Sequence, residues 1–289
     1  MKDLSIMAGR KTKVARLLLP PLLFCTGLLL YFLLEDQVID HWGIFNPKKF
    51  ISIVLLITAI EYFSFYVTTK IKGQESNLVI GFLSGLISST VLILSAAKLA
   101  RINPDAWRPL TIRAMSGQLA SISEMFVIVV IAAPTLFMPL AALVFAPIAV
   151  GAGTIIFLSR PEKCPPFPFP PAPPSLQAVM RLSLFLALIL GLIALGQKHA
   201  GNFGRLASAG ISGLFELHAL SLATATLFTE GQIETRQALW MLVTAMCASL
   251  GAKTILALVR GGGKFGAAVT LFSATLACLA LAGAWVGFA

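Results

Sequence analysis

Five ionisable side chains interrupt otherwise apolar stretches of this chain, and their types define the chemistry open to it: Glu61, Glu124, Glu216, His218 and Lys253. Charged groups at the depth of a hydrocarbon layer are costly, so they usually belong to ion pathways, proton relays or substrate sites. Three carboxylates against one lysine favour a cation or protons, whereas an anionic substrate would need Lys253 free of a carboxylate partner. The residue types therefore predict proton or ion chemistry inside a membrane.

The helices that must carry these residues place them at one depth. Counted from the predicted cytoplasmic end of each helix, all five fall within a band of roughly 9 Å, at about 1.5 Å per residue. In an unbroken helix Glu216 and His218 lie about 200° apart, so they cannot both face one partner. Glu216 shares its face with Ala209 and Gly213, which predicts that it points inward and pairs with Lys253 on the following helix.

Each of these residues also has a purely structural interpretation. Glu216 and Lys253 can form an ion pair that only fixes helix register, and His218 can be a packing histidine. Glu61, which lies beside aromatic residues, can be hydrogen-bonded structure or part of a pathway. Glu124 is the hardest to explain in this way, because no obvious cation lies on its own helix.

The composition places these residues in membrane helices. Hydrophobic residues make up 57% of the 289 residues and charged residues only 12%, and the mean hydropathy is +0.89, which leaves too little polar surface for a soluble protein. The apolar runs are continuous over about twenty residues, which is typical of membrane-spanning helices and not of barrel strands. We expect an all-α, polytopic membrane protein with about nine transmembrane helices, at 17–34, 50–69, 78–99, 112–133, 135–158, 176–196, 206–229, 238–259 and 266–288.

Two of these helices repeat one another. Residues 78–99 align with residues 206–227 at an offset of 128, which places Gly85 on Gly213. The same offset aligns helices two to five with helices six to nine. Because four crossings return the chain to its starting side, the two units must share one orientation and be related by a pseudo-twofold axis along the membrane normal. The sequence thus predicts two parallel four-helix repeats preceded by one extra helix.

The repeat adds two hydroxyl residues and two small-residue pairs to the candidate site. Ser88 and Thr90 stand in the first copy where Glu216 and His218 stand in the second. The small residues Gly81 and Gly85 recur as Ala209 and Gly213, a spacing that indicates close helix packing. If the third and seventh helices meet at the axis, all four polar residues lie near the centre of the protein.

The chain divides into four parts by these criteria. Residues 1–49 hold a basic N-terminus, the first transmembrane helix and a loop; residues 50–160 and 176–289 are the two repeats. Between the repeats, residues 161–175 contain eight prolines in fifteen positions, which predicts a stiff spacer. A ligand for a proline-recognising domain is the alternative for this segment.

The distribution of charge and cysteine excludes some partners and suggests an orientation. The net charge of +10 is spread among loops and not gathered on one face, so we expect no nucleic-acid partner. Five basic residues precede the first helix, which predicts a cytoplasmic N-terminus and no cleaved signal segment. The four cysteines are scattered and form no disulfide framework or zinc motif; we expect no cofactor, and whether a metal binds is left open.

Three stretches of the chain resemble a known family. GFLSGLISSTVLILSAAKLAR, GLFELHALSLATATL and AKTILALVRGGG are similar to the signatures of the C-terminal domain of unknown function found in one branch of the MgtC/SapB-related bacterial membrane proteins. The resemblance extends over residues 78–288. It implies an integral protein of the bacterial cytoplasmic (inner) membrane, in a family sometimes associated with magnesium or acid stress and without a defined substrate.

The candidate residues depart from the pattern of that family. Where the family usually has paired acidic residues this chain has Glu216 and His218, and where an arginine is expected in the fourth span it has Glu124. The resemblance retains the family's lysine as Lys253, whereas its asparagine appears here as Ser249. A site carried over from the family is therefore altered in this chain.

Two functions fit these residues. A transporter or permease for a cation or a proton-coupled solute accounts for carboxylates near the middle of a duplicated bundle. The alternative is a non-transporting accessory or regulatory protein that binds another membrane protein or a second copy of itself; it predicts a polar layer that is fully paired and dry. We expect no enzyme activity, because no nucleophile or metal motif accompanies the candidate residues.

Overall fold

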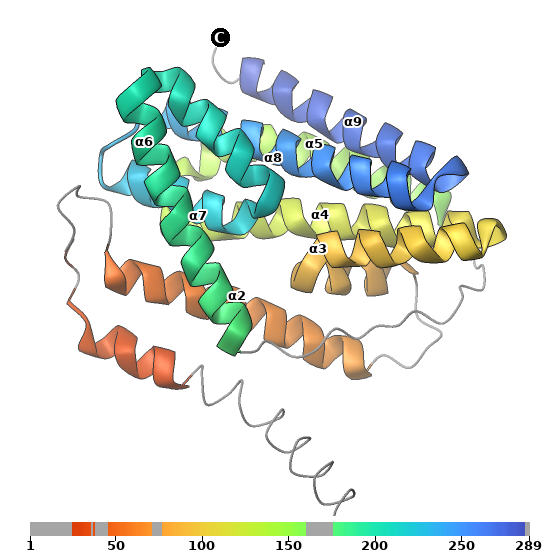
Figure 1. Cartoon of the computed structure of the whole chain (residues 1–289), viewed down its shortest axis with the longest axis horizontal. Helices are drawn as coiled ribbons and strands as arrows, with labels where there is room; N and C mark the ends of the chain where they lie inside the picture. The colour runs from red at the N-terminus through yellow and green to blue at the C-terminus, as the bar shows by residue number, and fades with distance from the viewer. Residues whose placement is uncertain (1–24, 36, 38–45, 71–76, 160–175, 287–289) are drawn as a thin grey trace, which may run out of the picture.

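All regular secondary structure in the described part of the chain is helical, as predicted (Figure 1). The computed structural model describes residues 25–35, 37, 46–70, 77–159 and 176–286. Residues 25–33 are helical, and the long helices that follow are α2 (Pro47–Lys70), α3 (Asn77–Ile102), α4 (Trp107–Ala132), α5 (Phe137–Leu158), α6 (Leu176–Phe215), α7 (Leu217–Thr229), α8 (Thr235–Leu256) and α9 (Gly263–Val286). Short turns join α3 to α4 and α4 to α5, and the π-helical segment η3 (Ala257–Gly261) extends α8.

Seven helices in the described residues are long and apolar enough to cross a membrane, which supports a multi-pass membrane protein. The sequence predicted about nine. Residues 17–24 of the first predicted helix lie outside the described residues, as do the basic N-terminus and the proline-rich spacer 161–175. The number of helices also differs because of α6 and α7. The chain reverses direction inside α6, and the helix is interrupted between α6 and α7.

The helix α6 is a hairpin of two antiparallel arms. The chain reverses at Ala200 and Gly201, where Gly201 has a φ of 54° that glycine adopts without steric cost. The Ser208 hydroxyl donates a hydrogen bond of 3.0 Å to the Leu192 carbonyl, although a straight helix would separate these residues by about 24 Å. Figure 1 shows α6 doubling back. The reversal falls between the sixth and seventh predicted spans. The first arm of α6 contains the sixth span, and the second arm contains the first part of the seventh.

Two helices are broken at equivalent positions of the predicted repeat. The backbone leaves the helical region at Ser88 inside α3 (φ −167°, ψ 99°) and at Glu216 between α6 and α7 (φ −149°, ψ 104°). Glu216 follows Ser88 by 128 residues, the offset of the repeat. The predicted spans 78–99 and 206–229 were therefore wrong in being continuous. Each break begins a second helical segment whose first N–H groups lack partners within that helix.

Small residues bring neighbouring helices together within each repeat. A side-chain carbon added to Gly81 or Gly85 would collide with the α4 backbone at Arg113 or Gly117. A carbon added to Gly213 would likewise collide with the α8 backbone, at Ala245, and Ala209 on the same arm of α6 is fully buried. These residues thus allow α3 to pack on α4, and the second arm of α6 to pack on α8.

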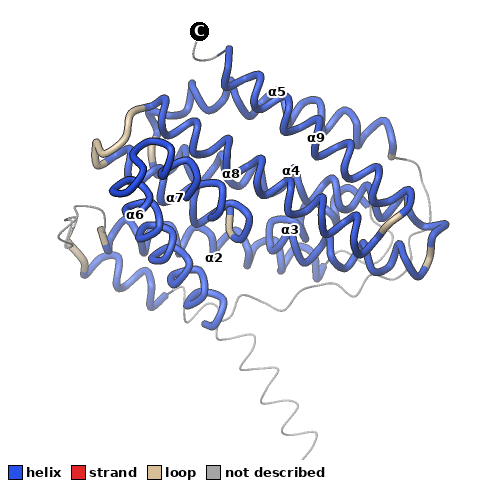
Figure 2. Tube along the Cα trace, turned by 45° about the horizontal axis from the view of Figure 1, so that its top comes forward, coloured by secondary structure: helices blue, strands red, loops and turns tan. Residues whose placement is uncertain are grey.

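The sequence suggested that the third and seventh predicted helices meet at the axis between the two repeats, and the contacts in the structure differ from this. It is α4, and not α3, that packs against α7, while α8 and its extension η3 pack against α3. The helices α5 and α9 pack side by side (Figure 2). These contacts pair each helix with the counterpart that a twofold relation requires, and the rotation that relates the two units stays a prediction.

Two buried arginines form hydrogen bonds within the same helix pairs, α3 with α4 and α6 with α8. The Arg113 guanidinium donates a hydrogen bond of 2.8 Å to Asn77, which joins α4 to the start of α3. Arg205 donates one of 2.9 Å to Gln237, which joins α6 to α8. Arg113 and Arg205 are each 6% exposed. Both arginines lie away from the polar layer, and we assign them to packing.

Candidate functional site

His218 lies between two carboxylates. Its Nδ1 atom is 3.2 Å from a Glu216 oxygen, and its Nε2 atom is 3.3 Å from a Glu124 oxygen. Glu216 belongs to the break before α7, His218 to the first turn of α7, and Glu124 to α4. The three residues form one cluster, which we call the carboxylate–histidine cluster.

The helix break is what brings Glu216 and His218 together. In a continuous helix their side chains would diverge by about 200°. The extended backbone at Glu216 turns its side chain back over the start of α7, where it accepts a hydrogen bond of 3.3 Å from the His218 backbone N–H. Glu216 is thereby the N-cap of α7, a position that carboxylates favour because of the helix dipole. The prediction that Glu216 and His218 face different partners was wrong for this reason.

The cluster has to hold a proton in order to satisfy its own contacts. A neutral imidazole has one N–H and one acceptor nitrogen, so it can face only one carboxylate favourably. Both ring nitrogens of His218 face a carboxylate oxygen. Either the imidazole is protonated or one carboxylate carries the proton, and the three groups titrate as one unit.

Glu124 depends on His218 for its charge compensation. Its side chain is fully buried, and neither of its oxygens has a hydrogen bond from the described residues. A buried carboxylate without a partner is strongly destabilising unless it takes up a proton. The contact with His218 is therefore the main described interaction that stabilises Glu124 as an anion.

Lys253 does not form the predicted ion pair. Both Glu216 and Glu124 contact His218, and among the described residues no carboxylate oxygen lies within 4.0 Å of the Lys253 ammonium. The break at Glu216 accounts for this, because it turns that carboxylate back onto the start of α7, where it contacts His218. Lys253 is 4% exposed and lines a cavity instead.

That cavity gathers most of the residues expected at the site. It has a volume of about 260 Å³ and lies where the two breaks meet α2 and α8. Six of the predicted site residues line it: Glu61, Ser88, Thr90, Glu216, His218 and Lys253. Glu124 lies behind His218 and is not part of the wall. The polar layer thus has an open space beside it, which we call the polar cavity.

The walls of the polar cavity also contain serines that were not among the candidate residues. Ser89, Ser121 and Ser249 line it, and the Ser121 hydroxyl donates a hydrogen bond of 2.6 Å to Ser89. Ser249 follows Ser121 by 128 residues. The offset that relates Ser88 to Glu216 also relates Ser121 to Ser249, so the repeat could have identified these two serines from the sequence.

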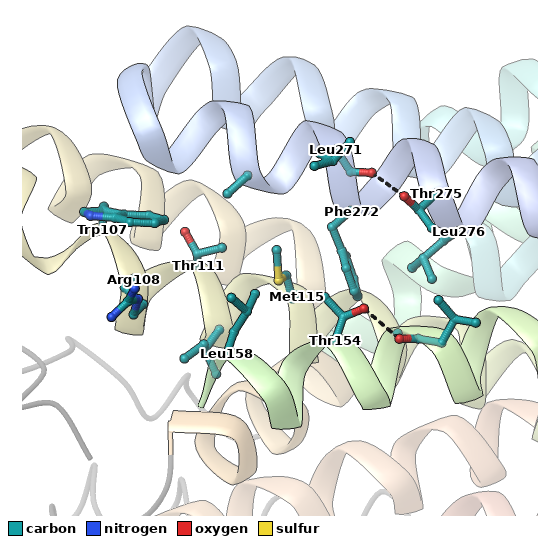
Figure 3. A pocket seen from close by; sticks show the side chains of 14 residues that line it. Trp107, Arg108, Thr111, Met115, Thr154, Leu158, Leu271, Phe272, Thr275 and Leu276 are labelled. Atoms are coloured by element: carbon teal, nitrogen blue, oxygen red, sulfur yellow. Dashed lines mark hydrogen bonds between the residues drawn. The ribbon is translucent and has the colours of Figure 1, made fainter. Parts of the chain in front are cut away.

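A second cavity, between α4, α5 and α9, is apolar. It has a volume of about 400 Å³, with Trp107 and Arg108 at one end (Figure 3). The hydroxyls of Thr154 and Thr275 point back to carbonyls of their own helices, as the dashed lines in Figure 3 show. These two hydroxyls are already used, and the rest of the wall is largely hydrophobic, so this cavity offers little chemistry.

The described residues contain no group of three or more His, Cys, Asp or Glu side chains arranged to hold a metal ion. Within the same residues, Cys25, Cys247 and Cys278 are free thiols. The groups that the described residues present at the site are carboxylates, an imidazole, an ammonium and hydroxyls.

Comparison with known proteins places the site in a family. The family described as "Domain of unknown function (DUF4010)" matches residues 55–261, which include all the residues named in the walls of the polar cavity and the carboxylate–histidine cluster. No curated protein and no solved structure matched the chain.

Proposed function

The chain belongs to the DUF4010 family, and we propose that it is a membrane transporter in which the carboxylate–histidine cluster takes up and releases a proton. The observation that carries this proposal is the position of His218, between Glu124 and Glu216 at a helix break beside the polar cavity. The proposal treats the chain as a carrier and not as an enzyme.

Broken helices around a cavity support a transport role. Non-helical backbone at membrane depth is tolerated where it is buried in protein or lines a cavity, and many carriers build their substrate and ion sites from such breaks. In this chain Ser88 and Glu216 mark the two breaks and both line the polar cavity. Their equivalence in the repeat is what an internally duplicated carrier requires.

The charge balance supports protons as the coupling ion. Both ring nitrogens of His218 face a carboxylate, an arrangement that is favourable only when the cluster carries a proton, and Glu61 lies in the wall of the same cavity. Gain or loss of that proton changes the net charge of the cavity wall by one unit. Such a change is large in a medium of low dielectric, so it can bias which side of the membrane the cavity opens to.

An accessory or regulatory role is the competing function. It predicts a dry and fully paired polar layer. The open space beside Glu216 and the absence of a described ion-pair partner for Lys253 favour transport over this role. The relation to the MgtC/SapB-related proteins, the location in the bacterial inner membrane and the cytoplasmic N-terminus belong to the same proposal.

Reconstitution into sealed vesicles tests the proposal. Vesicles that contain a trapped pH reporter receive the parent protein, Glu124→Gln or Glu216→Gln, with Thr154→Val in the apolar cavity as the matched control. We expect proton flux with the parent and the control and a large loss with the two glutamine variants. A folded parent that moves no protons, sodium, potassium or magnesium would support the accessory role.

A further inference from the structure

We infer that the polar cavity binds a small aliphatic monocarboxylate, with its carboxylate at the break in α3 and beside Lys253. This inference rests on the proposed function, since the carboxylate would bind beside the cluster that carries the proton and would be accepted by the same carrier. It names a substrate class that the carboxylate–histidine cluster alone does not define.

The second repeat contains an internal example of the binding mode. The Glu216 carboxylate sits at the start of α7 and accepts a hydrogen bond from a backbone N–H in the first turn of that helix. The equivalent residue at the break in α3 is Ser88, a neutral hydroxyl that accepts a long hydrogen bond of 3.4 Å from the Val91 N–H. One break thus has its own carboxylate, and the other has no anion although its helix start is equally electropositive.

Lys253 provides an independent indication of an anion. Its side chain is 4% exposed, lines the polar cavity and has no hydrogen bond or ion pair with the described residues. A buried ammonium is costly without a counter-charge at close range. Ser88, Ser89, Thr90 and Val91, which form the break in α3 and the start of its second half, line the same cavity. The break and the ammonium therefore face one space that an anion can fill.

The surrounding carboxylates explain why the anion would arrive with a proton. Glu61 and Glu216 line the polar cavity, and Glu124 lies behind His218. An added anion meets the field of these groups, so its binding becomes more favourable when the carboxylate–histidine cluster takes up one proton. Proton binding and anion binding then strengthen each other reciprocally.

The size and lining of the cavity narrow the class of anion. A volume of about 260 Å³ is below the range of roughly 300–1,000 Å³ that holds drug-sized ligands, so the ligand is small. One ammonium among several carboxylates favours a single negative charge over a dianion such as sulfate. Part of the wall can accept an aliphatic tail, because it is formed by apolar side chains: Ile57, Ile87, Phe185, Leu214, Phe215 and Leu217.

Calorimetric titration of the purified full chain in detergent with butyrate tests this inference, and butyramide, phosphate and sulfate serve as the comparison ligands. Binding in detergent avoids the passive leak of butyric acid through lipid. We expect butyrate to bind at mildly acidic pH and more weakly at alkaline pH. Butyramide, which has the same shape without the charge, should bind roughly ten- to a hundredfold more weakly.

Two variants place the carboxylate. Lys253→Met removes the ammonium, and Ser88→Glu gives α3 the carboxylate that α7 already has. Each should weaken butyrate binding by roughly tenfold or more, whereas Thr154→Val should leave it unchanged. Helical content and monodispersity verify that each variant is folded.

The outcomes separate this inference from the proposed function. Proton flux in vesicles without butyrate binding overturns the monocarboxylate and leaves the proton carrier. Butyrate binding without proton flux overturns the carrier and leaves the binding site. Equal binding of butyramide, or preferential binding of phosphate or sulfate, overturns the assigned class of ligand.

Discussion

At the residue scale, His218 compensates two carboxylates at once, so its loss is more damaging than the loss of either neighbour. His218→Gln leaves Glu124 buried without a cation, and we expect a destabilisation of about 3–5 kcal/mol unless Glu124 takes up a proton. The double variant with Glu124→Gln should recover most of that loss. Denaturant unfolding of the four proteins in a double-mutant cycle measures the coupling, and additive losses would show that the two residues do not interact.

A second residue-scale prediction concerns Lys253. Because Glu216 contacts His218 and not Lys253, the coupling energy between Glu216→Gln and Lys253→Met should be smaller than that between Glu216→Gln and His218→Gln. The same unfolding measurements provide both cycles. A larger coupling for the Glu216 and Lys253 pair would restore the ion pair that the sequence suggested.

At the element scale, the two helix breaks determine the site, and they explain what the sequence could and could not predict. Hydropathy is continuous through Ser88 and Glu216, and neither residue is a proline or glycine, so a helical span was the expected result. That expectation put Glu216 and His218 on different faces and paired Glu216 with Lys253. The depth of the ionisable residues depended only on position along each helix, so Glu61, Glu216, His218 and Lys253 were named before their contacts were known. The repeat added Ser88 and Thr90.

The close packing of α3 on α4 at Gly85 leads to a prediction at the scale of helices. A side-chain carbon at Gly85 would collide with Gly117 of α4, whereas one at Gly153 of α5 would meet open space. Gly85→Ala should therefore destabilise the protein by about 1–3 kcal/mol, and Gly153→Ala should not. Thermal unfolding in one detergent compares them directly. Equal effects of the two substitutions would mean that α3 and α4 do not pack as closely as described.

At the scale of the whole molecule, the offset of 128 residues organises the chain. The breaks at Ser88 and Glu216 and the serines Ser121 and Ser249 all obey it. The number of membrane helices was harder to predict, because the tight reversal inside α6 and the short α7 change how the segments are counted. The number of membrane helices depends on where the backbone turns, and local hydropathy does not show those turns.

The predicted parallel relation of the repeats can be tested by a labelling pattern. Arg101 and Thr229 are exposed, equivalent under the offset, and lie in the last turns of α3 and α7. Single cysteines at these positions, in a chain without its native cysteines, should react with a membrane-impermeant maleimide from the same side of the membrane. Reaction from opposite sides would indicate inverted repeats.

Proton flux through the reconstituted chain is the most direct test of the central claim, which is that the carboxylate–histidine cluster moves a proton across the membrane. The comparison is between vesicles that contain the parent, His218→Gln or Thr154→Val, and protein-free vesicles, under an imposed pH gradient. The account predicts flux with the parent and Thr154→Val, and a protein-free rate with a folded His218→Gln variant. Equal flux with His218→Gln and the parent would contradict it.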